Sequence, residues 1–394
     1  MKKPLLKLLS GVAAFGLATS AYSLTILPTF DASITNDVNG AAMKTAINYA
    51  ILVEQSNFTD NVTVKIHFTN DLSTGLGGSS SWGNDYTYST FLTALRNHAT
   101  SRNDTNGLSK IPNSSTDPLA GMNIIYLNLA PARLLGLDST YGTDGYDSTI
   151  SLNMSLMNLT RPPGNSSKYD LAQVCEHEMD EVLGCSSDIG FPEISPIDLF
   201  RYTTNLSGRF RTYTTAGDNA YFSVDGTNLL ARFNMDSSGD YSDWWSATSH
   251  WAPPGVTPHP QVQDAFATPN TAFDVGSNEL AMLDVVGWTL AVVSPPHVKI
   301  VRSGANQFTL SWTNTASGFV LQERTNLLAG AWANATTGST NPAVIVSTNK
   351  QKFYRLYNAT ATSHVLLNNA QSVVVSPPTT PPQLRVHVTH PAQP

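Results

Sequence analysis

The chain has 394 residues, and 13% of them are charged, whereas roughly 25% are charged in an average soluble protein. This length exceeds one ordinary domain, so two or three domains are expected. The net charge of −7 and the pI near 5.7 exclude the basic surface that a protein bound to nucleic acid or to an anionic membrane requires.

The N-terminus has the composition of a secretory signal peptide. Three lysines fall within the first seven residues, an apolar run follows over residues 8–19, and Ala21-Tyr22-Ser23 offers small residues for cleavage. We expect residues 1–23 to be removed and the mature protein to be secreted, to the extracellular space or the periplasm. An uncleaved N-terminal anchor is the alternative. No later run reaches the roughly 18 apolar residues of a transmembrane helix, so no membrane span is expected.

Helices and strands alternate after the signal peptide. Residues 39–55 carry apolar side chains at helical spacing, and residues 61–69 show the period-two alternation of a half-buried strand. A Gly/Ser-rich loop is expected at residues 73–83. The other expected elements are strands at 24–30, 122–128 and 149–154 and helices at 89–100, 169–183 and 279–286. Helices packed on a small sheet make an α+β domain, expected at residues 24–290.

The pattern changes at Ser294-Pro295-Pro296, because two prolines end any regular element. Residues 291–296 are therefore expected to form a Pro-rich linker. Short alternating strands separated by turn residues occupy residues 297–358, as in a small β-sandwich. Residues 359–394 contain two Pro-Pro pairs and are expected to form an extended, poorly ordered tail.

The helix expected at residues 169–183 carries His177, Glu178 and Glu181 in the pattern His-Glu-x-x-Glu-x-x-Gly. Residues four apart lie on one face of a helix, so His177 and Glu181 can point at one metal ion while Glu178 sits beside it. Zinc accepts imidazole and carboxylate ligands, and a hydrolytic zinc site needs a base that takes the proton of the metal-bound water. The pattern predicts His177 and Glu181 as ligands and Glu178 as the general base.

The carboxylate of Glu181 changes the expected chemistry. It adds negative charge, which makes the ion a weaker Lewis acid and its water less acidic than at an all-histidine site. Activity is therefore expected to be slower or to need a higher pH. The alternative is a solvated acidic helix on which His177 lies by chance. The apolar residues Val174, Val182 and Leu183 weigh against that alternative, because they predict a half-buried helix.

The two cysteines, Cys175 and Cys185, flank the motif. Ten helical residues span about 15 Å, which is too far for a disulfide. We expect two buried free thiols. Cys185 also falls on the face of His177 and Glu181, but it lies a further turn along the axis, so a thiolate ligand is the less favoured alternative.

Four further segments accompany the motif helix, and together they carry a resemblance. The five motifs, in order, are His-Glu-x-x-Glu-Val-x-Gly at 177–184, Asp-Leu-Phe-Arg-Tyr at 198–202, Ala-Tyr-Phe-Ser-x-Asp-Gly at 220–226, Gly-Asp-x-x-Asp-Trp at 239–244 and Leu-Asp-Val-x-Gly at 283–287. Through these five motifs, residues 25–288 resemble a family of secreted bacterial zincin-like metalloproteases related to the metzincins. The resemblance implies a metallopeptidase fold with a small sheet and an active-site helix, a zinc cofactor and a protein or peptide substrate.

The resemblance does not supply the third ligand. Metzincins place a histidine or aspartate three residues after the motif glycine, where this chain has Ser187, and Asp188 comes one residue late. We therefore expect Asp198 as the third ligand, although Arg201 could pair with it instead. Loop residues His250 and His259 are the weaker alternatives.

Other carboxylates offer oxygen ligands to calcium, which is the less favoured ion. They lack the spacing of a calcium-binding loop, and turns explain most Asp-Gly pairs. These residues are Asp218, Asp225, Asp240 and Asp243.

Residues 297–358 resemble the fibronectin-like modules at the C-termini of secreted bacterial proteins, through Phe-Thr-Leu-Ser-Trp at 308–312, Gly-Phe-Val-Leu-Gln at 318–322, Trp332 and Phe-Tyr-Arg-Leu at 353–356. No catalytic cluster is found there, so a spacer or a binding role toward a surface polymer is expected. The sequence thus predicts a secreted metal-dependent endopeptidase. The alternative is a catalytically silent zincin-like domain that acts as an extracellular binding or adhesion module.

Overall fold

A computed structural model describes the chain over residues 24–203, 211–213, 219–246, 252–253, 256–291, 298–304, 307–312, 319–325, 332–338, 340–346, 352–358 and 373–375. The predicted signal peptide and nearly all of the predicted linker and tail lie outside these residues. Among the described residues, no helix combines the length and apolar character that crossing a bilayer needs.

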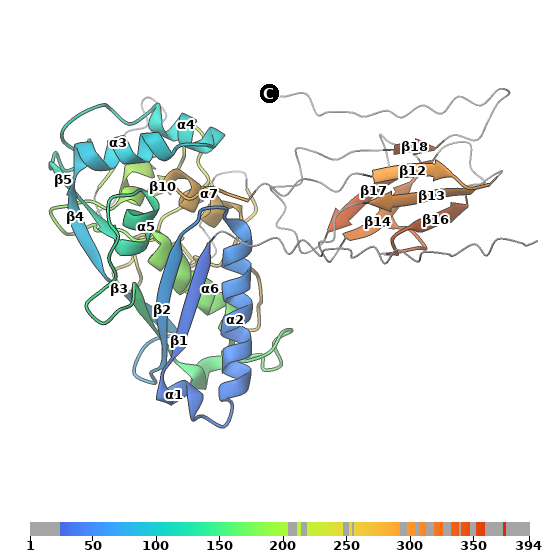
Figure 1. Cartoon of the computed structure of the whole chain (residues 1–394), viewed down its shortest axis with the longest axis horizontal. Helices are drawn as coiled ribbons and strands as arrows, with labels where there is room; N and C mark the ends of the chain where they lie inside the picture. Colours follow the sequence, from blue (N-terminus) through green and yellow to red (C-terminus); the bar gives the residue numbers. More distant parts are fainter. Residues whose placement is uncertain are drawn as a thin grey trace, which may run out of the picture.

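The N-terminal part is built on a four-stranded sheet (Figure 1). Its strand order is β1 (Thr25–Phe30), β2 (Thr63–Asn70), β6 (Ser148–Leu152) and β3 (Gly77–Ser81). The first three strands run parallel, and β3 pairs antiparallel with β6 at the edge. The alternation expected in β2 is present, since Val64, Ile66 and Phe68 are all fully buried.

Two helices pack against each other and against the sheet, α2 (Gly40–Asn57) and α6 (Leu171–Leu183). Helix α6 contacts β3 and β6, so the motif helix lies next to the edge strand. It begins where the Asp170 side chain accepts a hydrogen bond from the backbone of Gln173. It ends at Gly184, whose φ of 121° favours glycine.

Smaller elements complete this part. The helices are α1 (Ala32–Thr35), α3 (Tyr88–His98), α4 (Arg102–Leu108), α5 (Leu129–Leu134) and α7 (Ser277–Val285), with 3₁₀ turns η1 (Met154–Leu156) and η2 (Pro196–Phe200). The paired strands are β4 (Gly83–Thr87) with β5 (Ile124–Asn128), β7 (Met157–Asn158) with β8 (Tyr169–Asp170), and a sheet of β11 (Ala231–Arg232), β10 (Ala220–Phe222) and β9 (Arg201–Thr203). This mixed architecture is compatible with the expected α+β class. One core unites it, and its largest buried side chains are Trp244 and Trp288.

The expected helices and strands lie within a few residues of the observed ones, except at residues 73–83. The expected loop contains strand β3, because pairing with β6 imposes an extended backbone on Gly and Ser residues of low strand propensity. The prediction of a loop is therefore wrong at residues 77–81.

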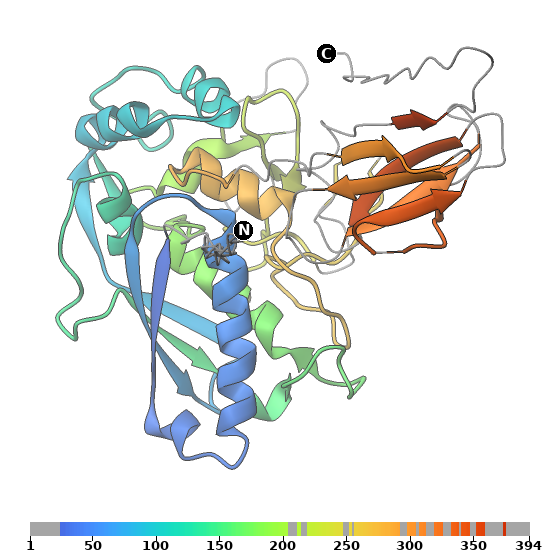
Figure 2. The same cartoon turned by 45° about the vertical axis from the view of Figure 1, so that its right-hand side comes forward.

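The described C-terminal part consists of strands in two antiparallel sheets (Figure 2). One sheet has the order β12 (Val298–Arg302), β13 (Gln307–Trp312), β16 (Ala343–Val346), and the other β15 (Ala333–Asn334), β14 (Phe319–Arg324), β17 (Lys352–Asn358), β18 (Val373–Val375). Leu310 and Trp312 of one sheet share a core with Leu321 and Tyr354 of the other. The fibronectin-like assignment stays a prediction. Strand β18 falls within the expected tail and pairs with β17.

Candidate metal centre

The acidic residues of helix α6 are buried. Glu176 and Asp180 are fully buried, and Glu178 and Glu181 keep only 5% and 8% of their surface exposed. A solvated charged helix would expose such side chains, so that alternative is wrong. Buried carboxylates persist where they are paired, protonated or bound to a metal.

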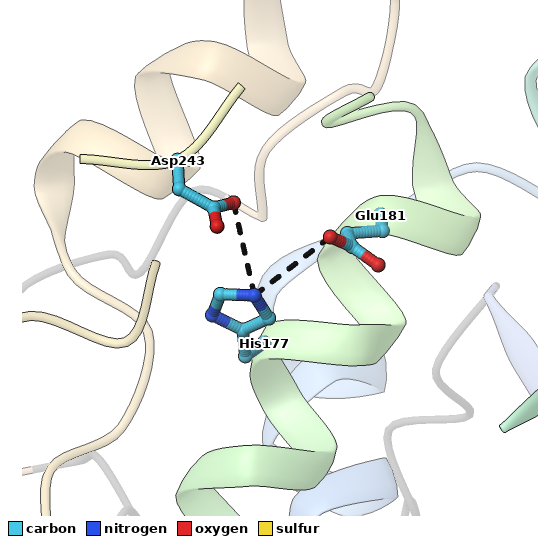
Figure 3. A group of neighbouring side chains, drawn as sticks. All are labelled: His177, Glu181 and Asp243. Atoms are coloured by element: carbon cyan, nitrogen blue, oxygen red, sulfur yellow. Dashed lines mark ion pairs between the residues drawn. The ribbon is translucent and has the colours of Figure 1, made fainter. Parts of the chain in front are cut away.

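His177, Glu181 and Asp243 come together at one point (Figure 3). His177 Nε2 lies 3.7 Å from Glu181 Oε1 and 3.7 Å from Asp243 Oδ1. One ligand atom from each residue lies within 4.8 Å of the others, the only such triad among the described residues. One imidazole and two carboxylates at this spacing fit the donor types and bond lengths of zinc.

Asp198 does not belong to this group, which corrects the expected third ligand. Its carboxylate accepts hydrogen bonds from Ser187 Oγ at 2.6 Å and from the backbone nitrogens of Asp188 and Ser195 at 3.2 and 3.0 Å. These bonds hold the turn at η2 together. Burial raises the pKa of Asp198 to about 6, although the charge of Arg201 and the hydrogen bonds act to lower it. Asp243, not Asp198, is the third residue of this group.

The sequence does not indicate that Asp243 lies near His177, because the segment around Asp243 has the composition of a turn. The sequence indicates Asp243 only as a calcium ligand in a turn, and the residue lies 60 positions (243 − 183) beyond the end of the motif helix at Leu183. Its backbone oxygen accepts a hydrogen bond from Asn234 at 2.7 Å, and the next residue, Trp244, donates its N–H to the Gln263 oxygen at 2.8 Å. These long-range contacts, rather than any sequence spacing, bring the carboxylate to His177.

The remaining candidates lie elsewhere. His250 and Asp218 fall outside the described residues, and His259 is not a member of the triad. The prediction of buried free thiols is confirmed for Cys175 and Cys185. Burial raises the pKa of both thiols well above the usual value, so they stay protonated and poor metal ligands.

Each member of the triad is oriented by a further hydrogen bond. His177 Nδ1 lies 3.0 Å from the Val262 carbonyl oxygen, which keeps the proton on Nδ1 and frees Nε2 for a metal. Ser79 Oγ donates to Glu181 Oε2 at 2.7 Å. Gln263 Nε2 donates to Asp243 Oδ1 at 2.9 Å. For His177 and Glu181 the arrangement matches metal sites in which outer hydrogen bonds fix the ligands.

The side chains of the triad and its surroundings gather an excess of negative charge. Burial raises the pKa of Asp243 to about 8, against the effect of His177. Burial lowers the pKa of His177, but the carboxylates of Asp243, Glu178 and Glu181 outweigh it and raise the value to about 10. Burial, and then the charge of Glu181, raises the pKa of Glu178 well above its usual range. A bound divalent cation would neutralise this charge.

The triad opens into a cleft of about 670 Å³. Its walls include Glu178 and residues of strand β3, and its charged lining residues are His177, Glu178, Glu181, Asp188, Asp240, Asp243 and Asp264. Gly77 on β3 packs so closely on Glu178 that a Cβ there would lie 2.4 Å from Glu178 Oε1.

A scan of the chain against protein-family models gave no match, and a search of curated proteins gave none either.

Proposed function

We propose that the protein is a secreted metal-dependent endopeptidase with a zincin-like N-terminal domain. The observation that carries this proposal is the convergence of His177, Glu181 and Asp243 on one point of an open cleft, with Glu178 beside them. The signal-peptide composition supports secretion, and the five ordered motifs support the peptidase class. The C-terminal strands would serve as a spacer or a binding module.

The residues divide the chemistry between them. His177, Glu181 and Asp243 would hold the ion, and a bound zinc would supply the Lewis acid that makes water a nucleophile near neutral pH. Glu178 accepts the proton of the attacking water and passes it to the leaving amine, as a buried carboxylate with a raised pKa can do. A positive charge held by the triad would lower the pKa of Glu178 toward the working range.

Strand β3 offers a place for an extended substrate. In the described sheet it pairs with β6 on one side only, and Gly77, Gly78 and Ser79 line the cleft. An unpaired strand edge can add a peptide strand through main-chain hydrogen bonds. A peptide bound there would pass Glu178, because Gly77 touches that side chain.

The proposal is tested on the purified mature protein. Elemental analysis should find one zinc per chain, and hydrolysis of a denatured protein substrate should stop with a chelator and return with zinc. Glu178→Gln should keep the metal and lose at least ~100-fold in turnover, since general-base catalysis contributes about 10²–10⁴-fold. A protein without stoichiometric metal would instead support the silent binding module, and unchanged turnover of Glu178→Gln would reject Glu178 as the base.

A further inference from the structure

Gln263 is held by its backbone in a fixed position beside the triad. Its N–H lies 3.3 Å from Glu279 Oε1, and its carbonyl oxygen accepts the N–H of Trp244 at 2.8 Å. The preceding residue, Val262, provides the carbonyl that contacts His177. The Gln263 side chain is fully buried and therefore has little freedom except to turn its terminal carboxamide.

That carboxamide points into the triad. Its Nε2 lies 2.9 Å from Asp243 Oδ1 and 3.4 Å from His177 Nε2. Its Oε1 is buried without a hydrogen-bond partner among the described residues. A buried amide oxygen without a partner is unfavourable, and native proteins usually give such an atom a donor or a cation.

The end of the Gln263 side chain lies beside two of the three triad members, His177 and Asp243, at distances close to those between neighbouring ligands of one metal ion. Bonds of about 2.0–2.2 Å to a tetrahedral zinc separate neighbouring ligand atoms by about 3.4 Å. His177 Nε2 lies 3.7 Å from both carboxylates of the triad and 3.4 Å from the Gln263 carboxamide. A half-turn of the carboxamide exchanges its nitrogen and oxygen without changing the space they fill.

We propose that the Gln263 Oε1 is a fourth protein ligand of the metal. The inference rests on the proposed metal site and describes its resting state. In the metal-free protein, Gln263 donates to Asp243; with metal present, its oxygen turns toward the ion. The loaded protein would then hold its ion with four side chains. Water or substrate could bind the ion only after Gln263 moves away, or if the ion accepts a fifth ligand.

Two substitutions separate a ligand from a mere donor to Asp243. Gln263→Leu removes both roles, whereas Gln263→Glu keeps a ligand oxygen but cannot donate and would repel Asp243 without a metal between them. Gln261→Leu is the matched control, because the Gln261 carboxamide lies in the same loop and contacts Asn278 instead. Thermal unfolding of the metal-free variants checks that each one folds.

The readouts are zinc affinity, by competition with a chromophoric chelator, and the visible absorption of the cobalt-substituted protein, which reports coordination. We expect Gln263→Leu to lose about 10–100-fold in zinc affinity and to change the cobalt spectrum, and Gln263→Glu and Gln261→Leu to bind zinc at least as tightly as the wild type. Wild-type affinity and spectrum in Gln263→Leu, or equal losses in Gln263→Leu and Gln263→Glu, would overturn the proposal. A wild-type protein that binds no metal would overturn the proposed function and this inference together.

Discussion

Ser79 Oγ donates a 2.7 Å hydrogen bond to Glu181 Oε2, and this bond joins the edge strand β3 to the motif helix α6. The other oxygen of the same carboxylate, Oε1, lies 3.7 Å from His177 Nε2. Ser79 therefore turns the Glu181 carboxylate so that one oxygen faces the triad. The strand that borders the cleft thus also sets the geometry of a candidate ligand.

Substitution Ser79→Ala should lower zinc affinity by about 10-fold, because it frees the Glu181 carboxylate to rotate. Chelator competition measures the affinity. Ser80→Ala is the matched control, since Ser80 is exposed on the same strand. Equal zinc affinities for the two variants would show that the hydrogen bond does not position the ligand.

The identity of the third ligand is tested by a pair of substitutions. Asp243→Asn should lose at least ~100-fold in zinc affinity, beyond the usual effect of an outer hydrogen bond, because it removes a charged ligand. Asp198→Asn should bind zinc like the wild type but unfold at a lower denaturant concentration, since an amide accepts fewer of the bonds at η2. The reverse pattern would restore Asp198 as the ligand.

The motif helix could be predicted from sequence, because its information is local. The i, i+4 spacing of His177 and Glu181 and the glycine at 184 that ends the helix lie within one short segment. The burial of the acidic side chains of this helix could not be predicted from the local sequence, because it depends on the packing of α2 and β3 against α6.

Asp243 and strand β3 could not be predicted, because neither has a local signature. Asp243 reaches His177 because its own carbonyl oxygen is bound by Asn234 and the next residue, Trp244, is bound to Gln263. The Gly and Ser residues of β3 are typical of a loop, and they adopt an extended backbone only because the segment pairs with β6. Tertiary contacts overrode local propensity at both places.

Gly77→Ala should impair catalysis more than metal binding. The added Cβ would lie 2.4 Å from Glu178 Oε1, so the carboxyl must move away from the cleft. We expect turnover to fall about 10-fold or more with zinc affinity preserved, because a displaced base costs rate. Gly75→Ala is the control, since its Cβ would meet no atom within 4 Å. A peptidase assay measures turnover, and chelator competition measures zinc affinity. A loss of zinc affinity in Gly77→Ala would contradict the prediction, because it would show that the substitution distorts more than the position of Glu178.

Zinc affinity should rise with pH. In the metal-free protein the pKa of His177 is raised to about 10 and that of Asp243 to about 8, so at pH 6–8 the metal must displace bound protons. For each proton that the metal displaces, the zinc affinity rises by up to about 10-fold with each unit of pH increase. Calorimetry in buffers of different ionisation enthalpy counts the protons released. A pH-independent affinity would mean that the triad is already deprotonated.

Behind the motif helix, Glu54 is a buried acid on α2 that no described residue pairs with. It is fully buried, and neither of its side-chain oxygens has a hydrogen-bond partner among the described residues. Burial, and then the charges of Asp180 and Glu176, raises its pKa well above the usual 4.5. The folded protein therefore binds a proton that the unfolded chain releases above that value.

The sign of the pH effect follows from this proton. An acid whose pKa is raised by folding contributes full stability below the unfolded pKa, and this contribution is lost as the pH rises toward the folded pKa. Glu54→Gln keeps the shape and removes the charge. Urea unfolding of chelator-treated protein should give both proteins similar stability near pH 4.5, and the wild type should then lose up to about 1.4 kcal/mol per pH unit relative to the variant. Parallel stability profiles from pH 4.5 to 9 would show that Glu54 ionises freely in the folded state, and that solvent reaches it between α2 and α6.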